Sequence, residues 1–284
     1  MSEKCNKKSE VKMVPLPSDF IIPKRDLGKN PVLEAVHLGI DFGGLIAVSD
    51  FNLAIGRTEI AGLIGPNGAG KTTVFNLLTK VYEPTRGTVL LNGKDTNNMN
   101  TVQIAKAGIA RTFQNIRLFN DLSVEDNVKL GLHNQIKYGT LSGILRLPRF
   151  WKGEREAQLQ ALDLLSIFNM QHMAKWRAGS LPYGAQRRLE IVRALATRPS
   201  VLLLDEPAAG MNPSETTDLM ENIVKVRDFF KIAILLIEHD MHLVMNICEG
   251  LCVLNFGKII AKGTPTEIQN NPDVIEAYLG KRKN

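Results

Sequence analysis

Residues 65–73 read Gly65-Pro66-Asn67-Gly68-Ala69-Gly70-Lys71-Thr72-Thr73, and the apolar run 59–64 stands directly before them. This is the complete pattern G-x-x-x-x-G-K-[ST], in the strand–loop–helix order that a phosphate-binding P-loop requires. Backbone N–H groups of such a loop converge on phosphates, and the positive end of the following helix adds to their attraction. The pattern predicts a nucleotide site, with Lys71 at the β- and γ-phosphates and Thr72 at Mg²⁺. The alternative is a ligand-free glycine-rich turn, but the full pattern arises by chance in only roughly one chain of this length in a hundred.

The composition indicates one globular domain with an appended arm. The chain has 284 residues, 44% of them hydrophobic, which is enough for a large buried core. We expect the domain over residues 32–284 and a basic arm over residues 1–31, where four prolines stand among charged residues. Much of the net charge of +6 lies near the two ends of the chain. Such charges are more often solvated tails than binding sites, so no specific nucleic-acid partner is expected.

Several classes of protein are disfavoured by the sequence. No apolar run approaches the ~20 residues that cross a bilayer. The first residues are charged where a secretory signal would be apolar. The three cysteines form no paired framework and lack metal-site spacing, which fits a reducing compartment without a zinc site. These features predict a cytoplasmic chain that cannot cross a membrane by itself.

The order of apolar and amphipathic stretches predicts an α/β fold with a mostly parallel sheet. Helices are expected after the P-loop and at 213–229 and 240–247, and the Asn92-Gly93 pair predicts a hairpin turn. The middle of the chain, at about residues 120–180, contains no convincing strand and is expected to form a helical insertion. Strands are expected at 32–38, 45–55, 59–64, 88–91, 109–113, 201–204, 232–237 and 251–261.

Two adjacent carboxylates follow one of the predicted buried strands. The apolar run 201–204 ends in Asp205-Glu206-Pro207. Ligands of parallel sheets bind at the carboxyl ends of the strands. Asp205 is therefore expected to hold Mg²⁺ through its water shell, and Glu206 to polarise the water that attacks the γ-phosphate. The alternative is a pair of acids that only caps the next helix.

Two further polar residues occupy comparable positions. The strand 232–237 is followed by Glu238-His239-Asp240, and His239 at the end of a strand beside the P-loop can reach the γ-phosphate. Gln114 stands where strand 109–113 passes into the insertion, and its amide can ligate Mg²⁺ or the attacking water. The alternatives are a solvated surface histidine and an ordinary turn residue.

This order of features resembles the ATP-binding subunit of ABC transporters over about residues 32–280. In that family's terms, residues 65–73 match the Walker A loop, Gln114 the Q-loop, residues 201–206 the Walker B strand with its catalytic Glu, and His239 the switch histidine. The resemblance implies an ABC-type P-loop NTPase domain with a mostly parallel core sheet, an antiparallel β subdomain and a helical subdomain at about 115–185. It also implies ATP hydrolysis with Mg²⁺.

Two more segments extend the resemblance. Phe42 matches the aromatic residue that stacks on adenine, and the signature motif is matched by Leu181-Pro182-Tyr183-Gly184-Ala185-Gln186. The family is implied to work as a head-to-tail pair, in which each signature helix grips the γ-phosphate held by the partner's P-loop. This signature departs from the common Leu-Ser-Gly-Gly-Gln, because Pro182 replaces the Ser, Tyr183 a Gly and Ala185 the Gln. Slower or asymmetric hydrolysis is expected at the site that it completes.

These departures point to a subfamily. Together with the segments 207–213, 263–268 and 274–280, they resemble the longer ATPase of branched-chain amino-acid uptake systems. That resemblance implies a second ATPase subunit or a second copy of this chain, two membrane permeases, and indirectly an external solute-binding protein. It places the chain on the cytoplasmic side of the membrane as a peripheral subunit. Two alternatives stay open: a soluble ABC ATPase that moves no substrate, and the ATPase of a lipopolysaccharide-type exporter, which is shorter near 134–165.

Overall fold

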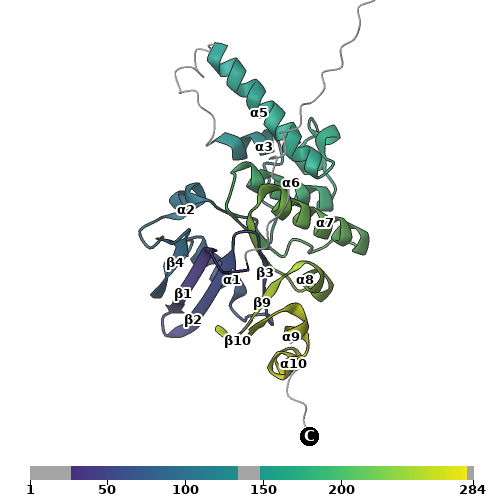
Figure 1. The fold of residues 1–284 in the computed structure, drawn as a ribbon. Helices are drawn as coiled ribbons and strands as arrows, with labels where there is room; N and C mark the ends of the chain where they lie inside the picture. The colour runs from purple at the N-terminus through teal and green to yellow at the C-terminus, as the bar shows by residue number, and fades with distance from the viewer. Residues whose placement is uncertain (1–26, 134–147, 280–284) are drawn as a thin grey trace, which may run out of the picture.

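The computed structural model describes residues 27–133 and 148–279, built around two sheets (Figure 1). The first sheet is antiparallel, with strand order β2-β1-β4-β5, and the second has the order β10-β9-β3-β8-β7-β6. In the second sheet all neighbouring strands are parallel except the β9–β10 pair. The strands are β1 (Pro31–Phe42), β2 (Leu45–Gly56), β3 (Ile60–Ile64), β4 (Arg86–Leu91), β5 (Lys94–Asp95), β6 (Ile109–Arg111), β7 (Val201–Asp205), β8 (Ala233–Ile237), β9 (Gly250–Asn255) and β10 (Lys258–Gly263).

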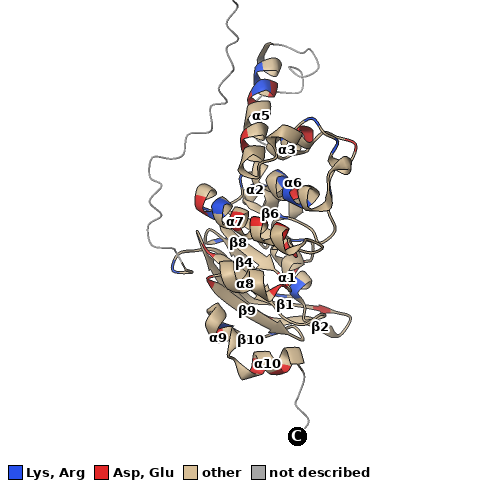
Figure 2. Ribbon diagram, turned by 90° about the vertical axis from the view of Figure 1, so that its right-hand side faces the viewer, with Lys and Arg blue, Asp and Glu red and all other residues tan. Residues whose placement is uncertain are grey.

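Helices lie around these sheets, and one group of them forms a lobe. Figures 1 and 2 show α3, α5 and α6 gathered at one end of the molecule, with α9 and α10 at the other end. We call the group α3, α5 and α6 the helical lobe. The helices are α1 (Lys71–Leu78), α2 (Thr101–Ala107), α3 (Val124–Leu132), α5 (Pro148–Ile167), α6 (Tyr183–Ala196), α7 (Pro213–Phe230), α8 (Met241–Ile247), α9 (Pro265–Gln269) and α10 (Pro272–Leu279).

The parallel strands are apolar throughout because both faces of their sheet are covered. Every residue of β3, β7 and β8 is buried. Alternate residues of β7 enter different cores: Leu202 and Leu204 pack with residues of the helical lobe, whereas Leu203 packs with residues of the antiparallel sheet. A continuous apolar run is what a strand with two buried faces requires.

The register of these strands brings the predicted polar residues to one edge. Ile237 lies opposite both Leu63 and Asp205, so β3, β8 and β7 end at the same level. The P-loop follows β3, Glu206 follows β7, and His239 comes shortly after β8. The carboxyl ends of adjacent parallel strands therefore assemble the site.

Most of the predicted elements are confirmed. The Asn92-Gly93 turn joins β4 to β5, with φ of 51° and 73° at its two central residues. The prediction of one strand over 251–261 was wrong: the chain turns at Phe256 and Gly257, where φ is 44° and 75°, and returns as an antiparallel β10. Residues 1–26 of the predicted arm and residues 134–147 of the predicted insertion lie outside the described residues. Within the described ranges, no helix combines the length and apolarity needed to span a bilayer.

Candidate nucleotide site

The P-loop depends on glycines at two positions of close approach. Gly65 has φ of 149°, and a Cβ there would lie 2.0 Å from the Leu254 carbonyl oxygen. Gly70 has φ of 104° and directly precedes α1, and a Cβ there would lie 2.9 Å from the Ala47 carbonyl oxygen. Because L side chains rarely adopt these conformations, the loop needs glycine at both positions. The N-terminus of α1 is thereby brought up to the loop, as an anion site requires.

Lys71 lies inside the P-loop. Its Nζ donates to the carbonyl oxygens of Gly65 and Pro66 at 2.7 and 2.9 Å. Burial of the ammonium lowers the pKa of Lys71, and the nearby Glu206 and Asp205 carboxylates act in the opposite direction. The cation is thus held inside the loop, while the next residue, Thr72, is exposed. This arrangement suits Lys71 for a polyphosphate and leaves the Thr72 hydroxyl accessible.

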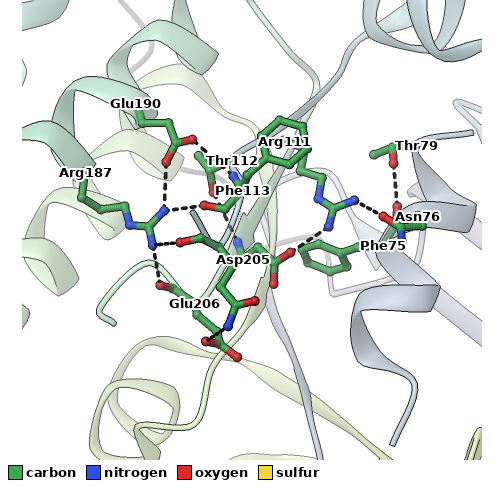
Figure 3. Close-up of polar contacts among 11 residues, drawn as sticks. Phe75, Asn76, Thr79, Arg111, Thr112, Phe113, Arg187, Glu190, Asp205 and Glu206 are labelled. Atoms are coloured by element: carbon green, nitrogen blue, oxygen red, sulfur yellow. Dashed lines mark hydrogen bonds and ion pairs between the residues drawn. The ribbon is translucent and has the colours of Figure 1, made fainter. Parts of the chain in front are cut away.

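Asp205 is buried and paired with an arginine that sequence reasoning missed. Arg111 Nη2 donates to Asp205 Oδ2 at 2.7 Å, and its Nη1 donates to Asn76 Oδ1 at 2.6 Å (Figure 3). The guanidinium also lies against the rings of Phe75 and Phe113, about 5.4 and 5.3 Å from their centroids. Arg111 comes from β6, next to β7, so the sheet topology rather than any local motif brings this pair together.

Glu206, Gln114 and His239, each predicted separately at the nucleotide, lie in contact through Glu206. Gln114 Nε2 donates to Glu206 Oε2 at 2.9 Å, and His239 Nε2 lies 2.7 Å from Glu206 Oε1. These residues come from three separate segments, at the ends of β6, β7 and β8. The carboxylate is therefore oriented by one amide and one imidazole. This orientation allows it to accept a proton from water at a fixed place.

Glu238 is a second residue that sequence reasoning missed. Its buried carboxylate accepts from the backbone N–H of Ala208 at 2.7 Å and of His239 at 3.0 Å. Burial raises the pKa of Glu238, and these backbone donors counter the rise. The contacts tie the segment after Glu206 to the segment that carries His239. The only sequence signal was an acid beside the histidine.

Phe42 ends β1 and is 46% exposed. Its ring makes an edge contact with Tyr82, with ring centroids 5.3 Å apart. The β1–β2 hairpin that carries Phe42 reaches the P-loop region, because the Ala47 carbonyl lies beside Gly70. The exposed ring leaves adenine stacking by Phe42 as a prediction.

The signature segment lies away from the P-loop of the same chain. Residues 181–186 cross the start of α6, and Figures 1 and 2 place α6 in the helical lobe, apart from α1. Pro182 is the N-cap residue and makes no side-chain cap hydrogen bond, so the helix start has no hydroxyl there. Tyr183 is 45% exposed, and Gln186 donates to the Leu181 carbonyl. This placement separates residues 181–186 from the P-loop of the same chain.

A groove of about 610 Å³ lies beside the segment that follows β6. Its wall is mainly apolar and carries three arginines. Arg117 lies 4.1 Å from the Phe113 ring centroid, and Arg193 lies 5.7 Å from that of Phe119. Its floor and sides come from α2, β6, α3 and α6. The groove therefore lies between the helical lobe and β6, the strand that carries Arg111.

Two sequence families match separate parts of the chain. A family described as ABC transporter matches residues 48–209, which is more than half of the chain. A second family, described as branched-chain amino acid ATP-binding cassette transporter, matches residues 258–284. The first match contains the P-loop, the signature segment and the Asp205-Glu206 pair.

Curated proteins match over most of their length. The chain is 49% identical over 251 residues to the high-affinity branched-chain amino acid transport ATP-binding protein LivG of Escherichia coli (strain K12), covering 88% of this chain and 98% of LivG. It is 47% identical, with the same coverage, to the corresponding protein BraF of Pseudomonas aeruginosa. Identity falls to 31%, again with the same coverage, for the lipopolysaccharide export system ATP-binding protein LptB of Haemophilus influenzae.

Solved structures share the fold. The crystal structure of the ADP conformation of MJ1267, an ATP-binding cassette of an ABC transporter, superposes with a TM-score of 0.77 at 28% identity, covering 88% of this chain and 99% of that chain. A nucleotide-free ATP-binding cassette from an ABC transporter gives 0.76 at 29% identity, covering 88% and 100%. The ordered motifs, the shared fold and the long matches lead to one conclusion: this chain belongs to the ABC transporter family, as an ATP-hydrolysing ATP-binding subunit.

Proposed function

We propose that this chain energises an importer of branched-chain amino acids. The observation that carries the proposal is its 47–49% identity, over nearly the whole length, to LivG and BraF, whose names state that activity. The match of residues 258–284 to the branched-chain family supports it from a separate part of the chain. The exporter alternative is less supported, because the identity to LptB is only 31%.

The site residues fit the hydrolysis of ATP. The P-loop amides and Lys71 hold the phosphates, and the Phe42 ring stacks on adenine. Glu206 accepts the proton of the attacking water, and Gln114 and His239 fix the direction of its carboxylate. His239 can also contact the γ-phosphate.

The oxygen donors fit a magnesium ion. Thr72 offers an exposed hydroxyl, Gln114 an amide oxygen and Asp205 a carboxylate that Arg111 already holds in place. Hard oxygen ligands of this kind are those that Mg²⁺ prefers. When bound, Mg²⁺ supplies neutralisation of the charge that develops on the phosphates.

The chain acts as one half of a head-to-tail pair. Because the signature segment lies away from its own P-loop, each ATP needs residues 181–186 of a second ATPase subunit or a second copy of the chain. The groove beside Arg117 and Arg193 receives a cytoplasmic segment of a permease, and two permeases complete the membrane part. The chain therefore works as a peripheral subunit on the cytoplasmic face of the membrane, and an external binding protein delivers the solute.

Uptake of labelled leucine tests the proposed function. Cells that lack the chain should lose most high-affinity uptake of leucine, isoleucine and valine and regain it with the natural sequence. Lys71→Ala and Glu206→Gln should not restore it, although both proteins accumulate. Normal uptake without the chain would reject the importer role.

Purification from gently solubilised membranes tests the partners. Two permeases and a second ATPase should accompany the chain. Recovery of a soluble chain with salt-sensitive RNA or DNA binding would favour the non-transport alternative.

A further inference from the structure

Arg187 is a buried arginine on the second turn of α6, and the predicted site did not include it. Its side chain is fully buried, and it is among the largest fully buried side chains of the described residues. Removing a guanidinium from water is costly unless its donors are satisfied. The partners of Arg187 therefore decide what it does.

Nη1 and Nη2 of Arg187 converge on the backbone of the two segments that follow β6 and β7, whereas its Nε has no hydrogen-bond partner among the described residues. Nη1 donates to the Phe113 carbonyl at 2.5 Å, and Nη2 donates to the Gln114 carbonyl at 2.7 Å and to the Glu206 carbonyl at 3.3 Å (Figure 3). The side chains of Gln114 and Glu206 contact each other on the other side of this backbone. One guanidinium thus holds the two residues whose side chains must meet.

Glu190, one turn further along α6, completes the arrangement. Its Oε2 accepts from Arg187 Nη1 at 2.9 Å, and its Oε1 accepts from the backbone N–H of Phe113 and of Arg117, both at 3.4 Å. The pair therefore binds both the N–H and the carbonyl of Phe113. We call Arg187 and Glu190 the α6 clamp.

The position of the clamp links two functional segments. Helix α6 begins at Tyr183, inside the signature segment 181–186, and Arg187 follows directly after it. A movement of this helix start therefore acts on the backbone of Gln114 and Glu206 through two hydrogen bonds from Arg187 Nη2. No other contact is needed to connect the signature segment of a chain to its own catalytic glutamate.

We propose that Arg187 is a positioning residue for ATP hydrolysis. It orients Gln114 and Glu206 through their main chain, and it makes the geometry of this site depend on the position of the signature segment, which serves the partner's ATP. This inference rests on the proposed function for the roles of Glu206 and of the signature segment. It predicts a defect in the chemical step rather than in ATP binding.

The test compares two variants of the purified full-length chain, or of its complex with its partners. Arg187→Lys keeps the charge but not the planar fork that reaches several carbonyls at once. The double variant Arg187→Met/Glu190→Met removes both charges of the clamp, which avoids an unpaired buried ion. The control is Arg177→Gln/Asp121→Asn, an exposed ion pair at the edge of the lobe. ATP affinity, kcat, KM and the thermal transition are measured for each.

The double variant is expected to bind ATP within about twofold of the natural chain but to lose kcat by roughly 10- to 100-fold, because small misplacements of catalytic groups have effects of this size. The kcat of Arg187→Lys should lie between the values of the double variant and the natural chain, with KM unchanged. The control variant should match the natural chain in both constants. If the double variant does not fold, Arg187→Lys alone decides.

Two results would overturn the proposal. In one, kcat of the folded variants stays within about twofold of the natural value. In the other, kcat and ATP affinity fall together, as they do when a site collapses. Lys71→Ala separates this test from the proposed function: if the natural chain hydrolyses ATP in a Lys71-dependent way, the ATPase stands whatever Arg187 does.

Discussion

Glu206 has a backbone conformation that a glutamate rarely adopts. Its φ is 48°, in the left-handed region that costs a side-chain-bearing residue about 1–2 kcal/mol. The surroundings fix this conformation, since the Glu206 N–H donates to the Ile237 carbonyl and the Glu206 carbonyl accepts from Arg187. Strain of this kind persists where neighbouring contacts determine the backbone, and it is concentrated at functional sites. The direction of the carboxylate is thus set by the main chain as well as by Gln114 and His239.

Lys71→Ala should weaken ATP binding by about 1.5–3 kcal/mol, the contribution of a hydrogen bond to a charged group. The reason is that only the P-loop amides then hold the phosphates. The measurement is a titration with a fluorescent ATP analogue, with the exposed Lys106→Ala as control. Equal affinity of Lys71→Ala and the natural chain would contradict a phosphate contact by Lys71.

Phe42→Ala should weaken ATP binding by about 1–2 kcal/mol if the ring stacks on adenine. The loss should be smaller for inorganic triphosphate, because that ligand has no base to stack. Calorimetric titration with both ligands measures the difference. Trp151→Ala, at another exposed aromatic residue, serves as the control. An equal loss for both ligands would place the adenine contact elsewhere.

At the scale of elements, local motifs predicted which strand ends lie together, and long-range pairs were missed. The P-loop, Glu206 and His239 each follow a short apolar run, so the ends of β3, β7 and β8 could be inferred from sequence. Arg111, Arg187 and Glu238 were missed because each acts on a segment brought near by strand order or helix packing. The single strand expected over 251–261 was wrong because Phe256, a residue that rarely turns the chain, does so here with φ of 44°. Asn255 and Gly257, which flank Phe256, are the turn signal that the sequence contains.

Helix α7 gives a prediction about an element. Asn212 caps α7: its side chain accepts from the Glu215 N–H at 2.9 Å, and the Glu215 carboxylate accepts from the Asn212 N–H at 3.1 Å. Asn212→Ala should lower the free energy of unfolding by about 1 kcal/mol. Urea unfolding measures it, with the exposed Thr217→Ala in the same helix as control. An unchanged urea midpoint would show that the capping box of Asn212 and Glu215 does not stabilise the folded chain.

At the scale of the whole molecule, the separation of the two phosphate-binding features is the decisive fact. The P-loop lies at the carboxyl end of β3 in the parallel sheet, whereas residues 181–186 lie at the start of α6 in the helical lobe. In the proposed head-to-tail pair, one chain presents half of a site at each of these two places. Two chains would then complete two sites, and ATP between them would contact both. Binding of ATP and closure of the pair are then linked by mass action.

Glu206→Gln separates this closure from hydrolysis. The amide keeps the shape and one oxygen acceptor but cannot take a proton from water, so hydrolysis should fall by about 10²–10⁴-fold while ATP stays bound. Bound ATP that is not cleaved should hold the pair closed, so light scattering with ATP should report twice the 31.5 kDa of one chain. Adding Lys71→Ala to the variant should shift dimer formation to higher ATP concentrations, because ATP then binds more weakly. A variant that turns over ATP at the natural rate would show that another residue is the base. If the variant binds ATP but stays monomeric, two copies of this chain do not close on each other. Closure would then require a different ATPase, with a different signature segment, as the second subunit.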